Sequence, residues 1–172
     1  MPLTLWGNPI LDHPSLPVLD DEFGDELAEL GERLHRVMRN AHGVGLAGPQ
    51  VGIAKRLFVY DCEGHRGFLA NPIIVDRSRD LAEDDEGCLS IPGFAWMTPR
   101  AAAVTVEGRD AFGQPITVDA SGYFARCMQH EVDHLNGQLF ISRLGGRLAK
   151  SAQRAAKQAS WYGEPHRFIP ID

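Results

Sequence analysis

The strongest constraint on this chain is the short stretch from Gln129 to Leu135, which reads QHEVDHL. On a helix, side chains four residues apart lie on one face about a turn apart, so His130 and His134 can bind one metal ion. Glu131 is then placed to take a proton from metal-bound water and return it to a leaving group. This H-E-x-x-H pattern predicts a metal hydrolase built around a mostly buried helix. The alternative is a solvent-facing helix that carries two histidines and an acid by chance.

A third metal ligand must come from elsewhere in the chain, and the cysteines are the candidates. Cys62, Cys88 and Cys127 are odd in number and far apart, which fits a reducing compartment better than a disulfide framework. Cys127 lies three residues before His130, close enough in principle to bind the same ion. We favour Cys88, because a ligand from another element leaves the open coordination position accessible, whereas Cys127 would lie deep in the core. A buried, inert thiol is the alternative for an isolated cysteine.

The composition narrows the class of protein. With 172 residues, 44% of them hydrophobic, the chain is long enough for a substantial core, and we expect residues 1–172 to form a single domain. No apolar run approaches the roughly 18–20 residues that span a bilayer, and the first residues lack a basic segment followed by an apolar one. We therefore expect a cytoplasmic protein without a membrane partner. The net charge of −6 argues against a protein that coats nucleic acid with its whole surface.

The hydrophobic pattern predicts both helices and strands. Apolar residues at three- and four-residue spacing predict a helix from about residue 20 to residue 40, after a proline-rich extended arm. The histidine helix starts near Gly122, and a last helix follows Gly146 and runs to about Trp161. The acidic residues 83–85 are expected in a solvated loop. Strands are expected over residues 56–61, 67–69 and 73–76, with a turn at Asn71-Pro72, and over a hairpin of residues 103–107 and 116–118.

A glycine-rich segment, residues 43–52, follows the first predicted helix. It contains four glycines and one proline, so it needs a tight and specific backbone path. Gln50 emerges from this path, and its amide side chain is therefore held in place. An ordinary helix-to-strand turn is the alternative. A phosphate-binding loop is disfavoured, because the segment lacks a Gly-Lys-Ser/Thr ending and follows a helix where a strand is required.

Three segments together resemble the signature motifs of one family. The glycine-rich segment, the segment Glu86-Gly87-Cys88-Leu89-Ser90 and the histidine stretch are similar, in order and spacing, to the motifs of the peptide deformylase family. The resemblance spans at least residues 43–137. It implies an α+β fold in which small antiparallel β-sheets surround a central metal-binding helix, with an N-terminal and a C-terminal helix. It also implies hydrolytic removal of formate from the N-terminal formyl-methionine of nascent polypeptides.

The resemblance assigns a role to each matching residue. It makes Cys88, His130 and His134 the metal ligands and Glu131 the general acid and base. Two neutral imidazoles and one thiolate leave a fourth position for water, so that metal-bound hydroxide attacks the formyl carbon. Gln50 and the backbone N–H of Leu89 would bind the oxyanion. The substrate-binding residues would be Gly43, Val44 and Gly45, which offer backbone edges, and Tyr123, Arg126 and Cys127, which line the methionine pocket.

The resemblance also makes Fe(II) the expected metal, and zinc, nickel or cobalt suit the same ligands. Glu86 is expected to pair with Arg100 and so brace the cysteine loop, and Asp133 to orient a ligand imidazole. Two residues depart from the family pattern: Gly48 stands where alanine is typical, and Arg126 where many bacterial members have an aliphatic residue. We expect Arg126 to lay its methylene stem along the pocket and to keep its charge in water.

The C-terminal segment is basic. From residue 138 onward the chain has six Lys/Arg and two Asp/Glu, a net charge of +4 against −10 for the remainder. Four of these basic residues line up along the last predicted helix: Arg147, Lys150, Arg154 and Lys157. They form either a solvated helix face or a surface that docks on ribosomal RNA.

Two other functions remain open. A zinc peptidase would cut internal amide bonds, but its third ligand is usually a histidine or a glutamate. A non-catalytic metal-binding or ribosome-associated module would bind metal without turnover. This second function is undermined because Glu131 and Gln50 are both present.

Overall fold

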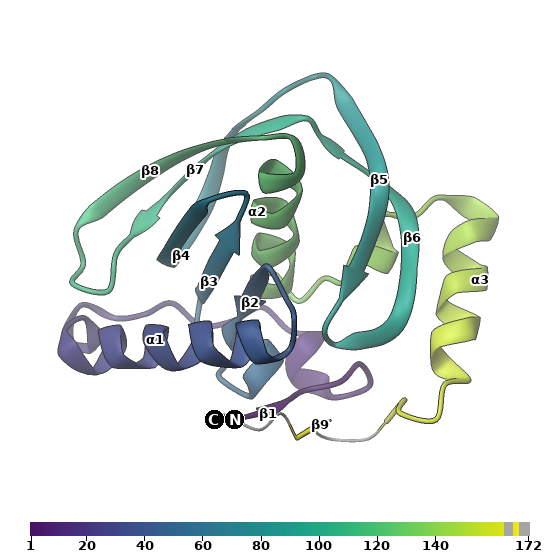
Figure 1. Ribbon diagram of the computed structural model, residues 1–172, viewed down its shortest axis with the longest axis horizontal. Helices are drawn as coiled ribbons and strands as arrows, with labels where there is room; N and C mark the ends of the chain where they lie inside the picture. The colour runs from purple at the N-terminus through teal and green to yellow at the C-terminus, as the bar shows by residue number, and fades with distance from the viewer. Residues whose placement is uncertain (164–166, 169–172) are drawn as a thin grey trace.

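The computed structural model describes residues 1–163 and 167–168 of the chain (Figure 1). Within them, the helices are α1 (Asp25–Asn40), α2 (Gly122–Leu135) and α3 (Gly146–Lys157). Short 3₁₀ turns are η1 (Pro9–Leu11), η2 (Asp20–Glu22), η3 (Gly48–Val51) and η4 (Phe140–Arg143). The strands are β1 (Pro2–Leu3), β2 (Gly45–Ala47), β3 (Leu57–Cys62), β4 (His65–Arg77), β5 (Leu81–Cys88), β6 (Ile91–Ala101), β7 (Ala103–Arg109), β8 (Pro115–Ser121) and β9 (Arg167–Phe168).

The strands form antiparallel sheets around α2. The larger sheet has the order β2-β3-β4-β7-β8, β5 pairs with β6 in a long hairpin, and β1 pairs with β9. In Figure 1, α2 stands between the five-stranded sheet and the β5–β6 hairpin, and α3 lies on the outer side of that hairpin. The predicted α+β fold, with small antiparallel sheets around a central helix and a further helix toward each end of the chain, is confirmed.

Helix α2 lies in the main hydrophobic core. Every residue from Phe124 to Leu135 is buried. Apolar side chains at four-residue and three-residue spacing, Phe124, Met128 and Leu135 among them, pack against the inner face of the five-stranded sheet. Polar residues of the same helix are buried as well, most of them against the β5–β6 hairpin. The alternative of a solvent-facing histidine helix is wrong.

Helix α1 packs against β2 and β3 through a second apolar cluster that includes Leu34, Val37 and Met38. It ends at Asn40 as predicted, but it begins at Asp25 and not near residue 20. Gly24 precedes it with a φ of 142°, a backbone conformation that glycine adopts readily and other residues do not. This glycine separates α1 from the short η2 turn, which the periodicity had merged with the helix.

One predicted strand boundary in the larger sheet is wrong. The turn at Asn71-Pro72 is an irregularity inside the single strand β4, where the register with β7 shifts between Ala70 and Ile73. Asn71 has a φ of 51°, and its side chain exchanges two hydrogen bonds with the backbone of Val18, at 2.8 and 2.9 Å. Asparagine tolerates this left-handed conformation, so the strand bends here without ending.

The acidic residues 83–85 lie in strand β5 and not in a loop, although they are exposed as predicted. Their partner strand, β6, was not predicted because Pro92, Gly93 and Pro99 interrupt its pattern. A two-stranded hairpin leaves one edge of each strand unpaired, and prolines are tolerated there. The predicted β7–β8 hairpin is confirmed, and α3 ends at Lys157, earlier than predicted.

No helix among the described residues is long and apolar enough to cross a membrane. A single domain over residues 1–172 stays a prediction.

Candidate metal centre and active site

Three side chains from two elements converge on one point. Nε2 of His134 lies 3.2 Å from Sγ of Cys88 and 3.2 Å from Nε2 of His130, and the three atoms all lie within 4.8 Å of one another. Nitrogen ligands bound about 2.0–2.1 Å from one tetrahedral ion would lie roughly 3.3 Å apart. The spacing and the thiolate-imidazole donor set therefore fit a divalent metal ion. These residues form a metal site, and they leave room for a fourth ligand.

The electrostatics of this cluster favour a cation. Burial alone would lower the pKa of His130, but hydrogen bonds to Cys88 and Glu86 raise it well above its ordinary value. The site therefore stabilises positive charge between a sulfur atom and a carboxylate. Burial and the neighbouring charge of His130 hold the pKa of His134 well below its ordinary value, so this imidazole is neutral, the form that binds metal.

Cys88 reaches the helix because the β5–β6 hairpin is irregular at its tip. The register between β5 and β6 shifts between Gly87 and Cys88, and Cys88 pairs with Ile91 across a tight turn. The backbone N–H of Ser90 donates to Sγ of Cys88 at 3.4 Å and fixes the sulfur. Cys127 instead donates to the carbonyl oxygen of Val44 at 3.6 Å. The preference for Cys88 over Cys127 as the third ligand agrees with this geometry.

Glu86 orients the first ligand histidine. Nδ1 of His130 donates to Oε1 of Glu86 at 2.6 Å, which turns Nε2 toward the metal site. Arg100 donates to both oxygens of the same carboxylate, at 2.6 and 3.0 Å. Burial alone would raise the pKa of Glu86, but His130 and Arg100 outweigh it and hold the pKa well below its usual range. The predicted pairing of Glu86 with Arg100 is present.

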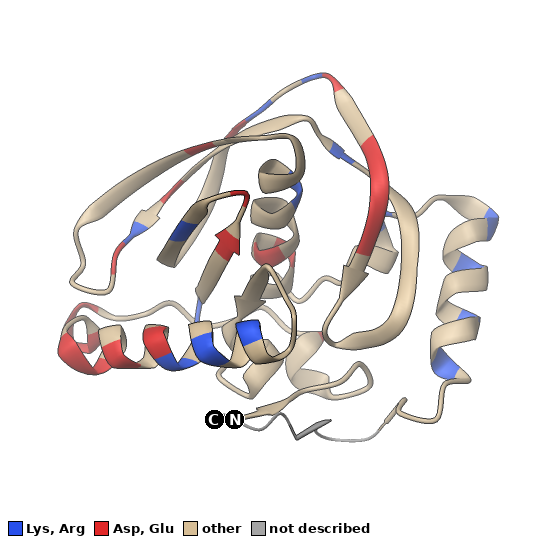
Figure 2. Ribbon diagram, in the orientation of Figure 1, with Lys and Arg blue, Asp and Glu red and all other residues tan. Residues whose placement is uncertain are grey.

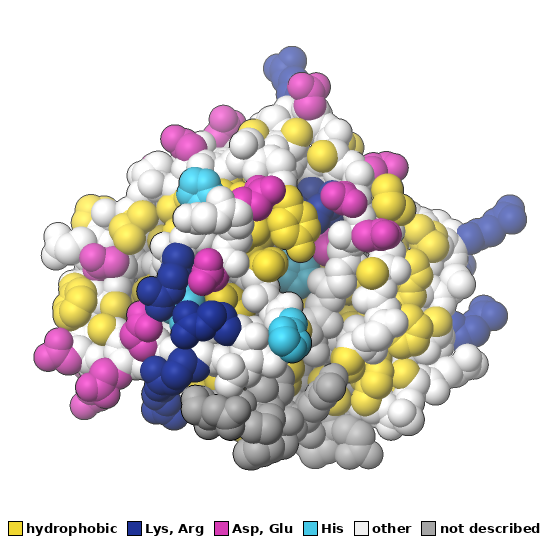
Figure 3. Space-filling view, in the orientation of Figure 1, with side chains coloured by type: hydrophobic (Ala, Val, Ile, Leu, Met, Phe, Trp, Pro, Cys, Tyr) yellow, Lys and Arg dark blue, Asp and Glu magenta, His cyan; other side chains and the backbone are white. Residues whose placement is uncertain are grey.

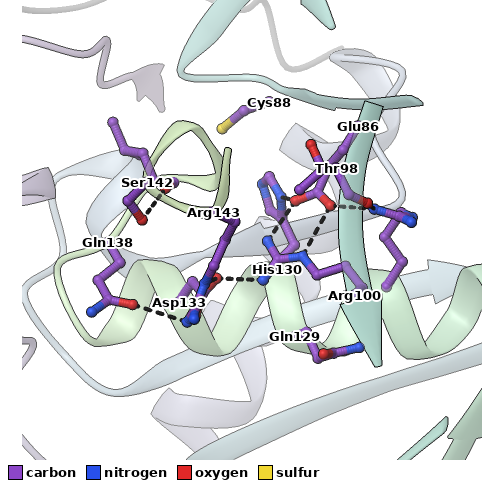
Figure 4. A network of polar contacts seen from close by, with 12 residues as sticks. Glu86, Cys88, Thr98, Arg100, Gln129, His130, Asp133, Gln138, Ser142 and Arg143 are labelled. Atoms are coloured by element: carbon purple, nitrogen blue, oxygen red, sulfur yellow. Dashed lines mark hydrogen bonds and ion pairs between the residues drawn. The ribbon is translucent and has the colours of Figure 1, made fainter. Parts of the chain in front are cut away.

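The expectation for Asp133 is wrong. Its carboxylate receives hydrogen bonds from Arg100 and Arg143 (Figure 4) and none from a ligand imidazole among the described residues. The two arginines explain the difference, because their guanidinium groups occupy both oxygens of the Asp133 carboxylate. Glu86 carries out the orienting role from another element of the fold.

The expectation for Arg126 is also wrong. The residue is 4% exposed, so its charge is not in water. Its guanidinium group donates to Oε2 of Glu86 at 2.7 Å, to the carbonyl oxygen of Thr98 at 2.7 Å and to that of Ala82 at 2.9 Å. Arg126 thus ties α2 to both strands of the β5–β6 hairpin. The sequence offered no signal for this ion pair, since Glu86 lies 40 residues away.

Glu131 is buried beside the metal site without an ionic partner. It is 3% exposed, and Oε2 has no hydrogen-bond partner among the described residues. Burial raises its pKa to about 7. The carboxyl group lies directly against the backbone of Gly45, where a Cβ atom would overlap Oε1. A carboxyl group with a pKa near the working pH can both accept and donate a proton.

Gln50 reaches the metal site from the glycine-rich segment. Its Oε1 accepts the backbone N–H of Ala47 at 2.8 Å, and its Nε2 donates to Sγ of Cys88 at 3.6 Å and to Oγ of Ser90 at 3.3 Å. These contacts hold the amide in place, as the sequence predicts. Gly48 is explained as well: a Cβ atom there would lie 2.7 and 2.9 Å from two backbone carbonyl oxygens.

A cavity of about 780 Å³ opens beside the metal site, and Figure 3 shows a hollow on this face with His atoms recessed in it. It contains all the predicted substrate-binding residues and the predicted oxyanion residues in its lining: Gly43, Val44, Gly45, Gln50, Leu89, Tyr123, Arg126 and Cys127. Cys88, His130 and Glu131 line it too, whereas His134 lies behind them. The predicted site residues therefore share one place in the fold.

Comparison with known proteins agrees with this geometry. Residues 1–150 match the family model described as polypeptide deformylase. The chain belongs to the peptide deformylase family. The recognition made from the three sequence motifs is confirmed.

Similar proteins with this family name cover nearly the whole chain. The peptide deformylase of Acidothermus cellulolyticus is 45% identical over 96% of this chain and 91% of its own length. The peptide deformylase 2 of Streptomyces coelicolor is 45% identical over 94% of this chain and 92% of its own length. The sequence similarity to these deformylases therefore covers nearly the whole chain, well beyond the three motifs.

Solved deformylase structures share the fold. The Thermus thermophilus enzyme gives a TM-score of 0.84 with 39% identity, over 91% of this chain and 92% of that one. The Synechococcus elongatus enzyme, solved in complex with actinonin, gives 0.83 with 38% identity, over 95% of this chain and 91% of that one. The α+β architecture around the metal-binding helix is therefore that of the family.

Sequence reasoning missed two contacts of this deformylase site. Oγ of Ser90 fixes the amide of Gln50, and Phe140 stacks on the ring of His130 with their centroids 6.0 Å apart. Ser90 lies inside a recognised motif, so its position was a usable signal. Phe140 belongs to the η4 turn after α2, and nothing in its local pattern distinguishes it from an ordinary core residue.

Proposed function

We propose that this chain hydrolyses the formyl group from the N-terminal formyl-methionine of nascent polypeptides, with Glu131 as the residue that carries the proton. The family makes the chain a peptide deformylase, a metal-dependent hydrolase. The observation that carries the catalytic assignment is the buried Glu131, with a pKa of about 7, next to the Cys88-His130-His134 site.

When bound by these ligands, a divalent metal ion supplies Lewis acidity and lowers the pKa of water toward neutrality. Glu131 accepts a proton from the attacking water, whose oxygen bonds to the formyl carbon. Glu131 then donates a proton to the amide nitrogen as the carbon–nitrogen bond breaks. Formate and a free amino terminus leave, and the carboxyl group returns to its starting state.

Gln50 and Leu89 stabilise the oxygen that becomes negative during the reaction. Nε2 of Gln50 is fixed beside Sγ of Cys88, which places an N–H donor at the metal site before substrate binds. The backbone N–H of Leu89, in the turn after Cys88, supplies the second donor in this proposal. Each such donor contributes about 3–4 kcal/mol to transition-state stabilisation.

The peptide is proposed to bind along β2. This strand pairs with β3 on one side and lies at the edge of the five-stranded sheet, and Gly43, Val44 and Gly45 line the cavity there. The N–H of Gly43 and the carbonyl oxygen of Val44 are bonded within the chain, so the peptide is proposed to pair with the other backbone groups of this segment. The methionine side chain then enters the cavity between Tyr123, Arg126 and Cys127. Gly45 allows the substrate backbone to approach Glu131 closely, because it has no Cβ atom.

Fe(II) is the proposed native metal, and zinc, nickel and cobalt are the proposed substitutes. One soft thiolate and two imidazoles accept all four ions. Metal analysis of protein purified without oxygen from unsupplemented cells tests this proposal. Iron at about one equivalent per chain supports it, and zinc at the same level would contradict it.

The basic face of α3 is proposed to dock on ribosomal RNA, in a cytoplasmic setting where nascent chains emerge. Arg147, Lys150, Arg154 and Lys157 are all exposed, and Figure 2 shows them spaced along the helix. Their replacement by glutamine should weaken ribosome binding and reduce its salt dependence. Glutamine substitution of the exposed Arg33, Arg36 and Arg39 on α1 provides the control. Equal binding by the α3 variant and the native protein would make this surface a solvated helix face.

Formate release tests the reaction directly. Nickel-loaded protein is incubated with formyl-Met-Ala-Ser, acetyl-Met-Ala-Ser and unblocked Met-Ala-Ser. Release of formate from the formyl peptide, with the other two left intact, is the expected result, whereas cleavage of the unblocked peptide would point to a peptidase. Glu131→Ala should retain one equivalent of metal and lose turnover. Retained turnover in that variant would refute the mechanism.

A further inference from the structure

Arg126 is held rigidly at the wall of the cavity. Its three hydrogen bonds reach a carboxylate on β5 and backbone carbonyls on β5 and β6, at 2.7 to 2.9 Å. Among the described residues that line the cavity, it is the single Lys or Arg. A guanidinium group with three such anchors cannot swing away when a substrate enters. It is therefore a preorganised donor rather than a mobile charge.

The anchors leave part of the guanidinium group unused. Arginine has five N–H donors, and three of them are accounted for by Glu86, Thr98 and Ala82. The Nε–H and one N–H of Nη2 donate to no other described residue. Nε has no hydrogen-bond partner among the described residues, and it is not one of the atoms that the protein encloses completely. Part of its surface is therefore accessible. Because Arg126 lines the cavity, we take the Nε–H to be the donor that an occupant of the cavity meets.

We propose that Arg126 is a specificity-determining residue that recognises a hydrogen-bond acceptor at the tip of the first side chain, so that the enzyme also deformylates peptides that begin with formyl-methionine sulfoxide. The inference rests on the proposed function, because it places the first side chain in the cavity beside Arg126. A sulfoxide is the methionine thioether with one added oxygen, a strong acceptor in place of a weak one.

The reaction itself does not change. Water adds its oxygen to the formyl carbon, the bond between that carbon and the amide nitrogen breaks, and the nitrogen receives the proton from Glu131. The sulfoxide takes no part in this exchange and leaves with the product peptide. Arg126 acts in binding only, and no oxidant or reductant is needed.

The groups that line the cavity determine how much kcat/KM changes when the methionine is replaced by its sulfoxide. In an apolar pocket the sulfoxide oxygen would lose its hydrogen bonds to water without replacement, and kcat/KM would fall about a hundredfold or more relative to formyl-methionine. With the fixed donors of Arg126, kcat/KM is expected to stay within about tenfold. Because sulfoxide sulfur is chiral and the guanidinium group is anchored, the two epimers should differ, with one clearly preferred.

The experiment uses the nickel-loaded full chain and formate release. The substrates are formyl-Met-Ala-Ser, the two separated sulfoxide epimers of the same peptide, and formyl-norleucyl-Ala-Ser as a reference with no acceptor. The variant is Arg126→Met, which removes all donors but keeps an unbranched side chain. Tyr123→Phe is the matched control, since Tyr123 also lines the cavity and its hydroxyl is the alternative donor.

The native enzyme is expected to hydrolyse one epimer within about tenfold of formyl-methionine. Arg126→Met should lower the sulfoxide-to-norleucine ratio of kcat/KM about tenfold, mainly through KM, and Tyr123→Phe should keep the native ratio. If Arg126→Met does not fold, Arg126→Lys replaces it. A lysine lacks the anchored planar group, so this variant should lose the preference for one epimer, and an unchanged preference would overturn the inference.

Each opposite result has a separate meaning. Hydrolysis of formyl-Met-Ala-Ser with a loss of a hundredfold or more for both epimers overturns the inference and leaves the proposed function intact. A ratio that falls in Tyr123→Phe and not in Arg126→Met overturns it as well, because it assigns the donor to Tyr123. Failure to release formate from any substrate refutes the proposed function itself.

Discussion

Replacing Glu131 with glutamine tests how far the fold disfavours the charged form of this carboxyl group. Burial raises the pKa of Glu131 from 4.5 to about 7. At 1.36 kcal/mol for each pKa unit, this difference corresponds to about 3 kcal/mol of folding free energy. Glutamine has nearly the same shape and does not titrate. The comparison of the two proteins therefore isolates the contribution of a single proton.

The sign of the effect follows from proton binding in the two states. Between pH 4.5 and pH 7 the folded protein holds a proton on Glu131 that the unfolded chain has released. The free energy of unfolding therefore falls as the pH rises through this range, and the stability that the neutral carboxyl group contributes is fully present only below pH 4.5. The Glu131→Gln variant should lack this loss. Its free energy of unfolding should therefore rise by about 2–3 kcal/mol relative to that of the native protein between pH 5 and pH 8.

Urea denaturation of chelator-treated, reduced protein measures the difference, with tryptophan fluorescence as the probe. The free energies of unfolding of both proteins are determined at intervals from pH 5 to pH 8. Titrating groups that do not interact with Glu131 are common to the two proteins and cancel in the comparison. His130 and Cys127 contribute to the difference as well, because the charge of Glu131 raises their pKa values. A difference between the proteins that stays constant with pH would show that Glu131 titrates normally. That result would remove the physical basis for its role as a proton carrier near neutral pH.

Three further substitutions test separate parts of the site. Glu86→Ala should cost about 3–5 kcal/mol in urea denaturation, because it leaves the buried Arg126 without its carboxylate and removes one of the two carboxylates that pair with Arg100; a cost below about 1 kcal/mol would contradict this. Gly45→Ala should reduce kcat/KM about a hundredfold while circular dichroism stays native, since the new methyl group displaces the carboxyl group of Glu131; native activity would show that the backbone yields there. Gly48→Ala should lower the free energy of unfolding by about 1–3 kcal/mol, because two rigid carbonyl oxygens meet the methyl group, and unchanged stability would refute the close contact.

The metal-binding helix was predictable because its information is local. The spacing of His130 and His134 fixes their common face, and the glycines before Gln50 fix a backbone path within a few residues. The choice of Cys88 over Cys127 also came from sequence, by asking which ligand leaves a coordination position open. These arguments need no knowledge of strand pairing, and the ligand cluster agrees with them.

The errors came from partners far away in the sequence. Asn71-Pro72 reads as a turn by composition, but the backbone of Val18 pairs with Asn71 and keeps β4 continuous across it. Similarly, Arg126 reads as a snorkelling side chain until Glu86 is placed beside it from a strand 40 residues earlier. A single sequence does not encode these pairings in any short pattern, because they depend on which strands meet.

The buried charges explain why two nearby glutamates act differently. Glu86 and Asp133 are balanced by Arg100 and Arg126, and all four side chains are at most 6% exposed. Burial alone would raise the pKa of Glu86, but hydrogen bonds from His130 and Arg100 outweigh it and hold the pKa low, so Glu86 remains an anion that orients His130. No cation of this cluster bonds to Glu131, so burial dominates and its pKa rises to about 7.

The arginine that departs from the family pattern therefore has a role in this separation. Arg126 adds a second guanidinium group to the carboxylate that orients His130, and it forms no ion pair with Glu131 among the described residues. The two carboxyl groups thus differ through their surroundings: the pKa of Glu86 is held low, and burial raises that of Glu131 to about 7. A cation within hydrogen-bonding distance of Glu131 would lower its pKa and remove that capacity.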